Sequence, residues 1–266
     1  MRSTQAATSF QSGLAVHAYA NPLSLVYGEG TVGPTPEFRT LDAIRPSLRD
    51  PNCVGPDPVY AIAMDVYRPE HRESLRRRML LYGVVAYASG RLGKEPVRSQ
   101  GHIHAVAPHC GWSTPELFEI WEGRAIVYAQ ERATDDPGRC IAVEAGPGDQ
   151  VVVPPNWAHC VVNADVNSIM VFGACCDREY GFDYQGVRAH GGLAWFPEVF
   201  DDGHIGWNAN PRYVQAPLSV RRARAYPELN LLPSLPIYEQ LIREPERVQW
   251  VSDPSRFRSL WSAFEP

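Results

Sequence analysis

Short apolar runs, separated by turn residues, dominate the middle of the chain. Runs of this kind, bounded by Gly, Pro, Asn or Asp, are typical of β-strands. They predict strands over Val59–Val66, Leu80–Ala88, Pro96–His104, Leu117–Trp121, Ala125–Gln130, Ile141–Val143, Gln150–Val153, Cys160–Asn163 and Ser168–Cys175. Since no helical pattern separates the runs from Leu80 onward, the sequence favours an antiparallel sandwich or barrel.

The segments outside these runs carry weaker patterns. Residues 1–25 indicate a loosely held arm, and Phe38–Leu48 indicates a short helix limited by Pro46. Pro69–Leu75 is compatible with a short charged helix or a turn, and Ile237–Ile242 is mildly helical after a proline-rich stretch.

These patterns predict one domain with extensions at both ends. We expect an N-terminal strand and helix extension over residues 1–57, a barrel core over 58–200, and an irregular C-terminal wrap or tail over 201–266.

The composition is that of an ordinary globular protein. Of 266 residues, 44% are apolar and 21% are charged. The net charge of −5 does not favour binding to nucleic acid or to an anionic membrane. No stretch approaches the roughly 18 apolar residues of a membrane span. The first 19 residues do not resemble a signal peptide, and the six cysteines lack CxxC or disulfide-framework spacing, so we expect reduced thiols in the cytoplasm.

Gly101–His104 carries the first candidate chemistry. Side chains alternate between the faces of a strand, so His102 and His104 share one face and Ile103 points to the other. Two imidazoles about 7 Å apart on one face can bind a single ion. Such a pair alone is equally compatible with ordinary packing.

A carboxylate follows on a later strand. Glu116 would share its face with Phe118 and Ile120, a mostly apolar interior, whereas Glu119 falls on the opposite face. We therefore prefer Glu116 as the carboxylate ligand. A third element, Gly148–Asn163, combines a turn glycine, an apolar strand and a proline corner with a histidine on the next strand.

Together the three elements resemble the two-part signature of the cupins. The first half consists of His102, His104, Glu116 and Gly123, and the second of Gly148, Pro154, His159 and Asn163, with Asn156 where glycine is usual. The resemblance implies an all-β jelly-roll barrel (a double-stranded β-helix). It also implies one divalent metal held by His102, His104, Glu116 and His159. Such ligands suit Fe, Mn, Ni, Co or Zn. A cupin that has lost its metal is the alternative, although all four ligands are present.

The chain more specifically resembles the cupin-type glucose-6-phosphate isomerases known from archaea, over roughly Phe38 to Pro197. The resemblance is carried by Arg39–Asp42, Pro58–Tyr60, Gly90–Glu95, Gly101–His104, Pro154–His159 and Tyr180–Tyr184. It implies aldose–ketose interconversion at the metal, by proton transfer between adjacent carbons or by hydride shift.

The chain departs from this family where substrate contacts are expected. Two family threonines correspond to Ser99, which keeps a hydroxyl, and Val85, which does not. Phe118 and Phe182 replace a tyrosine and a histidine, and Cys175 or Cys176 replaces another tyrosine. We predict that the substrate-binding residues are Ser99, Phe118, Phe182 and Arg98, although a solvated outer face is the commoner place for Arg98.

The catalytic base is unassigned, because a ligating Glu116 is a poor free base. Tyr180 and Tyr184 are candidates for positioning substrate or relaying a proton, and aromatic core packing is the alternative for both. Eleven residues, Ala105–Pro115, separate the second histidine from Glu116. This insertion, with His109, Cys110 and Trp112, is either a packed loop or a lid over the pocket.

Three functions stay open. The first is a metal-dependent sugar or sugar-phosphate isomerase. The second is an iron-dependent oxygenase, or another metal-assisted lyase or epimerase, on a non-phosphorylated small molecule, and the third is a non-catalytic sugar-binding cupin. In each case we expect a small-molecule ligand, no nucleic acid, no membrane and a homodimer.

Overall fold

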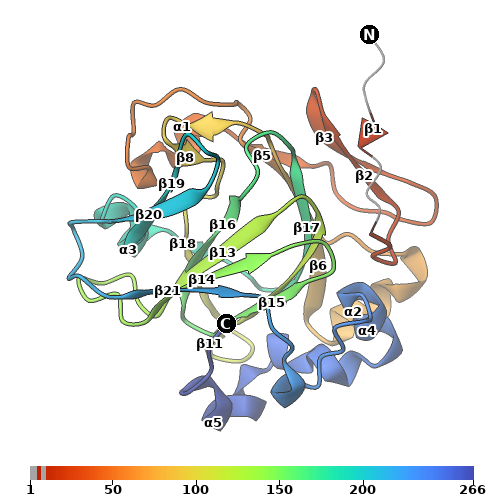
Figure 1. The fold of residues 1–266 in the computed structure, drawn as a ribbon. Coiled ribbons are helices and arrows are strands. Elements are labelled where there is room, and N and C mark those ends of the chain that lie inside the picture. The colour runs from red at the N-terminus through yellow and green to blue at the C-terminus, as the bar shows by residue number, and fades with distance from the viewer. Residues whose placement is uncertain (1–4, 7–9) are drawn as a thin grey trace.

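Two facing β-sheets form the centre of the computed structural model, which describes residues 5–6 and 10–266 (Figure 1). The main sheet has six antiparallel strands in the order β15 (Gln150–Val153), β12 (Glu116–Glu122), β17 (Met170–Asp177), β6 (Leu80–Tyr87), β5 (Tyr60–Met64) and β4 (Glu37–Arg39). The second sheet contains β16 (Ala158–Asn163), β13 (Ala125–Gln130), β14 (Cys140–Ala145) and β21 (Leu218–Arg222), with β21 parallel to β14. This arrangement is the expected all-β jelly-roll barrel.

Smaller elements surround the barrel. The strands outside the two large sheets are β1 (Gln5–Ala6), β2 (Val16–Ala20), β3 (Leu23–Tyr27), β7 (Arg91–Leu92), β8 (Glu95–Pro96), β9 (Ile103–His104), β10 (Val106–Ala107), β11 (Trp112–Ser113), β18 (Phe182–Asp183), β19 (Trp195–Val199) and β20 (Ile205–Ala209). The α-helices are α1 (Leu41–Ile44), α2 (Arg72–Arg77), α3 (Gln185–Ala189), α4 (Ile237–Arg243) and α5 (Arg258–Trp261). Short 3₁₀ helices span Arg45–Ser47, Pro69–His71, Pro227–Leu229, Pro245–Val251 and Pro254–Phe257. Among the described residues, no helix has the length and apolar character needed to cross a membrane.

Strand alternation separates two apolar layers at the main sheet. Along β12, Phe118 and Ile120 face the barrel interior, whereas Leu117 and Trp121 belong to a second cluster on the outer face. Each such side chain contributes roughly 1.5–3 kcal/mol on full burial. Because both faces are covered, β6 and β17 are buried along their whole length, which explains their continuous apolar sequences.

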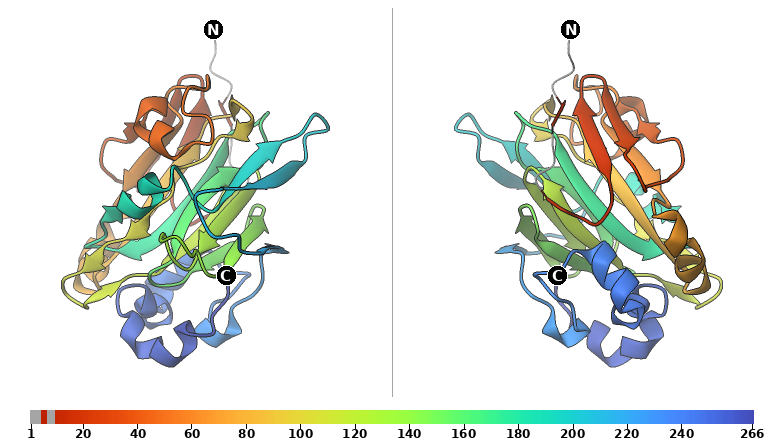
Figure 2. Two further views of the ribbon diagram at one scale, coloured as in Figure 1. Left: turned by 90° about the vertical axis from the view of Figure 1, so that its left-hand side faces the viewer. Right: turned by 90° about the vertical axis from the view of Figure 1, so that its right-hand side faces the viewer.

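Both ends of the chain cover the outer face of the main sheet. Figures 1 and 2 show the β2–β3 hairpin and the C-terminal helices around this side of the barrel. Leu23 and Leu25 from the hairpin and Tyr238 and Trp250 from the C-terminal part belong to one buried cluster. The expectation of a loosely held arm over 1–25 is therefore wrong for β2 and β3, and residues 1–4 and 7–9 lie outside the described residues.

The predicted strand over Pro96–His104 is interrupted. Gly101 has φ of +90°, and a Cβ atom there would lie 2.8 Å from the side chain of Leu193, so glycine is required. Beyond this bend, His102 pairs with His159 through two backbone hydrogen bonds of 3.1 and 2.9 Å. The bend thus joins the segment before β9 to the edge of the second sheet.

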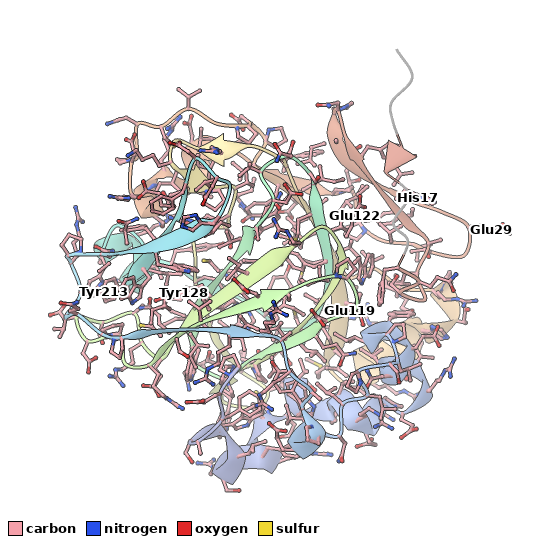
Figure 3. The ribbon with its side chains drawn as sticks, viewed as in Figure 1. His17, Glu29, Glu119, Glu122, Tyr128 and Tyr213 are labelled. Atoms are coloured by element: carbon pink, nitrogen blue, oxygen red, sulfur yellow. The ribbon has the colours of Figure 1, made fainter. Side chains whose placement is uncertain are left out.

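A hydrogen bond to Glu119 links the C-terminal part to the main sheet. Glu119 lies on the outer face of β12, facing α4, as Figure 3 shows, and it is fully buried. Its carboxylate accepts hydrogen bonds from Ile237 N (2.8 Å), Trp121 Nε1 (3.2 Å) and Tyr82 Oη (3.4 Å). Burial nevertheless dominates and raises the pKa of Glu119 to about 7.

A substitution at this position should change how stability depends on pH. Since the folded pKa of about 7 exceeds the ordinary value of 4.5, the Glu119 contribution is complete below pH 4.5 and is lost as pH rises to about 7. As pH rises from 4.5 to about 7, the free energy of unfolding of Glu119→Gln should increase by roughly 3 kcal/mol relative to that of the wild type. Urea unfolding of both proteins at several pH values measures this difference, and a difference that is constant with pH would contradict the assignment.

Candidate metal centre

Four side chains from three parts of the chain converge on one point. His102 precedes β9, His104 ends it, Glu116 begins β12 and His159 lies on β16. One ligand atom from each lies within 4.8 Å of the others, and only His102 is more than slightly exposed. We call these residues the His/Glu group.

Backbone carbonyls orient two of the imidazoles. His104 Nδ1 lies 2.9 Å from the Thr114 carbonyl oxygen, and His159 Nδ1 lies 3.1 Å from that of Trp157. Because a carbonyl oxygen only accepts, each Nδ1 carries the hydrogen and donates it. The Nε2 lone pairs are therefore available at the centre of the group, as metal binding requires.

The two oxygens of Glu116 have different neighbours. Oε2 lies 3.1 Å from His159 Nε2 and 3.2 Å from His104 Nε2, whereas Oε1 accepts a hydrogen bond of 3.0 Å from Cys176 Sγ. The Nε2 atoms of His102 and His104 are buried without a hydrogen-bond partner. Buried nitrogens that face a carboxylate without a hydrogen-bond partner fit a bound cation, and the donor set suits a divalent transition metal.

The electrostatics of the group also favour a positive charge at its centre. Burial, reinforced by the other two imidazoles, lowers the pKa of His102 well below its usual value. Burial opposes ionisation of Glu116 as well, but contacts with His104 and His159 outweigh it and hold the Glu116 pKa well below its ordinary range. The pKa of His104 is raised, since contact with Glu116 outweighs the lowering by burial. An anionic carboxylate among imidazoles attracts a cation.

A cavity opens beside the His/Glu group, and three of its members line it. We call it the central cavity; its lining is Arg39, Tyr60, Ile62, Met64, Val85, Tyr87, Ser99, Gln100, His102, Glu116, Phe118, His159, Val161, Phe172, Ala174, Phe182 and Tyr184. Of the residues predicted from the sequence, Ser99, Phe118, Phe182 and Tyr184 are in this lining. Tyr180 instead lines a neighbouring outer cavity, which shares Arg39, Ile62, Met64 and Phe182 with the central one.

Arg98 does not reach the central cavity. Its guanidinium is buried against Glu95 at 2.6 Å and donates to the carbonyl oxygens of Ser47 (2.7 Å) and Ser99 (2.9 Å). The prediction of Arg98 as a substrate contact is therefore wrong, and so is the alternative of a solvated face. Each nitrogen of the guanidinium has a partner within the protein, so this buried ion pair is not directed at a ligand.

The Ala105–Pro115 insertion packs against the C-terminal part. His109 lies 3.0 Å from both Glu179 Oε2 and the Ser252 carbonyl oxygen, and the Arg258 guanidinium lies 4.9 Å from the Trp112 ring centre. Neither His109, Cys110 nor Trp112 lines the central cavity. The packed-loop alternative fits these contacts, and the end of the loop supplies the Thr114 carbonyl that orients His104.

Sequence reasoning missed Arg39, Tyr60 and Gln100 as cavity residues. Arg39 and Tyr60 are paired across β4 and β5, and both lie in segments that carry the family resemblance. The resemblance was therefore the available signal, but the sequence does not show that the two segments are neighbours in the sheet.

Comparison with known proteins identifies relatives of this chain. The family model described as glucose-6-phosphate isomerase matches residues 44–215. A protein of Rhizobium meliloti (strain 1021), whose name assigns it to these isomerases, is 30% identical over 149 residues, which cover 54% of this chain and 63% of that protein. The glucose-6-phosphate isomerase of Thermococcus kodakarensis is 30% identical over 156 residues, 58% of this chain and 74% of that enzyme. The chain thus spans less than two thirds of the first relative.

Likeness to solved structures is weaker. Hazelnut vicilin covers 49% of this chain and 33% of its own, with 10% identity and a TM-score of 0.35. A score this low supports no argument, so the fold assignment depends on the strand topology described above.

Loss of one member of the His/Glu group should weaken metal binding. His159→Ala removes a donor, and we expect its affinity for Co²⁺ to fall by more than roughly 100-fold, since even the outer partners of metal ligands are worth 10- to 100-fold. Equilibrium dialysis with metal analysis measures this. His190→Ala, at a histidine that stacks on Tyr213 outside the group, is the control. Full metal retention by His159→Ala would overturn the ligand assignment.

Proposed function

Because the chain belongs to the glucose-6-phosphate isomerase family, we propose that it is a metal-dependent aldose–ketose isomerase acting on a sugar or sugar phosphate. His102, His104, Glu116 and His159 hold one divalent ion (Fe, Mn, Ni, Co or Zn) in this proposal. The convergence of these four side chains beside a cavity is the observation that carries it. Glucose 6-phosphate is the first substrate to test, since the relatives are named for it.

The bound metal would act as a Lewis acid that polarises the carbonyl and hydroxyl oxygens of an open-chain sugar. The polar side chains of the central cavity then orient the substrate. Burial raises the pKa of Tyr60 to about 12, and it also raises the pKa of Tyr184 although Arg39 and Arg188 oppose this. Both phenols are therefore protonated at neutral pH and donate hydrogen bonds to substrate oxygens.

The cavity favours a hydride shift over proton transfer through an enediol. Proton transfer needs a free base within reach of the substrate carbons. Among the described residues that line the central cavity, the histidines and the glutamate all belong to the His/Glu group, and Tyr60 and Tyr184 are protonated. In a hydride shift the hydrogen moves with its electron pair from one carbon to the next, and the hydroxyl proton passes to the former carbonyl oxygen, so no base is needed at carbon. The buried, largely apolar walls exclude water from this transfer.

Arg39 supports an anionic substrate. Among the described residues it is the one lysine or arginine that lines the central cavity, and its Nε is buried without a hydrogen-bond partner. A guanidinium with unused donors beside a cavity is suited to a phosphate or carboxylate. Val85 lines the same cavity, but its side chain cannot form a hydrogen bond. Arg39 therefore takes over part of the phosphate binding that the resemblance assigns to a threonine hydroxyl.

A second candidate is supported by the apolar part of the cavity. Ile62, Met64, Phe118, Phe172 and Phe182 line one continuous space beside the His/Glu group. Such walls suit a less hydroxylated molecule, as an iron-dependent oxygenase or a metal-assisted lyase or epimerase would bind. The absence of substrate-dependent oxygen consumption by iron-loaded protein would eliminate the oxygenase.

We also propose a single-domain homodimer that works in the cytoplasm. The common cluster formed by the hairpin, the main sheet and the C-terminal helices supports one domain. Half-exposed Phe38 on the edge strand β4 supports pairing, which the sedimentation mass tests. Six unpaired cysteines support a reducing compartment, and a native disulfide detected by mass spectrometry would oppose it.

The isomerase proposal predicts turnover without oxygen. Metal-loaded protein should convert glucose 6-phosphate to fructose 6-phosphate anaerobically, and a chelator should abolish the activity. In D₂O the product should retain its transferred hydrogen, because a hydride shift does not exchange with solvent. Incorporation of about one deuterium per turnover would instead require a base and would refute the hydride shift.

Arg39 should control affinity for a phosphorylated substrate. Charge-assisted hydrogen bonds are worth about 1.5–3 kcal/mol, so Arg39→Met should raise KM for glucose 6-phosphate about 10- to 100-fold. Arg39→Lys should give an intermediate value, and binding of unphosphorylated sugars should change little. Arg68→Met, at an exposed surface ion pair, is the control. An unchanged KM in Arg39→Met would exclude Arg39 from substrate binding.

A further inference from the structure

Among the described residues, the Cys176 thiol is the one hydrogen-bond partner of Glu116 Oε1, the carboxylate oxygen that does not face His104 and His159. Sγ lies 3.0 Å from Oε1, while Oε2 faces the Nε2 atoms of His104 and His159. We propose that Cys176 is a positioning residue of the metal centre, which holds Oε1 by a hydrogen bond and thereby presents Oε2 to the ion. This inference depends on the proposed metal site.

The register of the main sheet brings this thiol to the centre. β12 and β17 are antiparallel with Leu117 opposite Cys175, so the next residue along each strand brings Cys176 beside Glu116. Because faces alternate, Cys176 points into the barrel with Phe118, whereas Cys175 points to the outer face with Leu117. Two adjacent cysteines with equal burial therefore have different surroundings.

The thiol donates in this contact. Sγ lies 3.0 Å from Oε1, and because an ionised carboxylate oxygen only accepts, the hydrogen between the two atoms belongs to the thiol. A buried carboxylate oxygen without a partner would be costly, since charged groups lose most on desolvation. Cys176 satisfies Oε1, while the unpartnered Nε2 atoms of His102 and His104 mark the other side of the carboxylate as the place of a cation.

The hydrogen bond should affect the metal in two ways. It limits rotation of the carboxylate, which favours binding through Oε2 alone over binding through both oxygens. It also withdraws charge from Glu116, and outer partners of this kind commonly tune both affinity and geometry.

Three cysteine variants of the full-length protein test the proposal, with Co²⁺ as the probe. Cys176→Ala removes the donor, Cys176→Ser keeps a donor with a similar loss of volume, and Cys175→Ala is the matched control on the other face. Co²⁺ affinity is measured by competition with a chelator, and the visible d–d spectrum reports the coordination of the ion. Thermal unfolding without metal verifies that each variant folds.

We expect Cys176→Ala to bind Co²⁺ about 10- to 100-fold more weakly, with an altered d–d spectrum. Cys176→Ser should recover most of the affinity, and Cys175→Ala should match the wild type. Wild-type affinity and spectrum in Cys176→Ala, or equal losses in the Ala and Ser variants, would overturn the inference while leaving the metal site intact. Unchanged Co²⁺ binding by His159→Ala would instead refute the metal site itself, so the two failures are distinguishable.

Discussion

A buried carboxylate surrounded by imidazoles needs a compensating positive charge, and this constraint organises the centre of the molecule. Glu116 lies between His104 and His159 with its ligand oxygen about equally distant from both. Removing such an anion from water costs several kcal/mol unless partners replace its hydration. The backbone carbonyls of Thr114 and Trp157 prevent the rings from turning away, because they already accept the Nδ1 hydrogens. The group is therefore held in an arrangement that a cation satisfies.

The rest of the fold keeps this arrangement rigid. The inner face of the main sheet supplies Glu116, and its outer face is covered by segments from both ends of the chain. Glu119 belongs to the same strand and accepts a hydrogen bond from Ile237, so the strand that carries the carboxylate is itself tied to the C-terminal part. Sites supported on both sides in this way hold their geometry better than sites on free loops.

Local patterns allowed the barrel and the His/Glu group to be predicted from the sequence. The strands β13 and β15 coincide with the predicted runs Ala125–Gln130 and Gln150–Val153, because turn residues bound them closely. Face alternation placed Glu119 on the opposite face of β12 from Phe118, as the structure shows. The N-terminal hairpin was missed, since its short strands become buried only against a sheet formed by distant residues.

The two arginines near the cavity show why substrate contacts were harder to predict than the His/Glu group. Arg98 is close in sequence to His102, but its guanidinium forms a buried ion pair with Glu95, three residues earlier. Arg39 is far from His102 in the sequence and reaches the cavity only because β4 pairs with β5. A histidine pair on one face is fixed by backbone geometry alone, whereas a long cationic side chain goes wherever tertiary structure offers acceptors. Arg39, whose Nε lacks such an acceptor, is consequently the arginine free to recognise an anion.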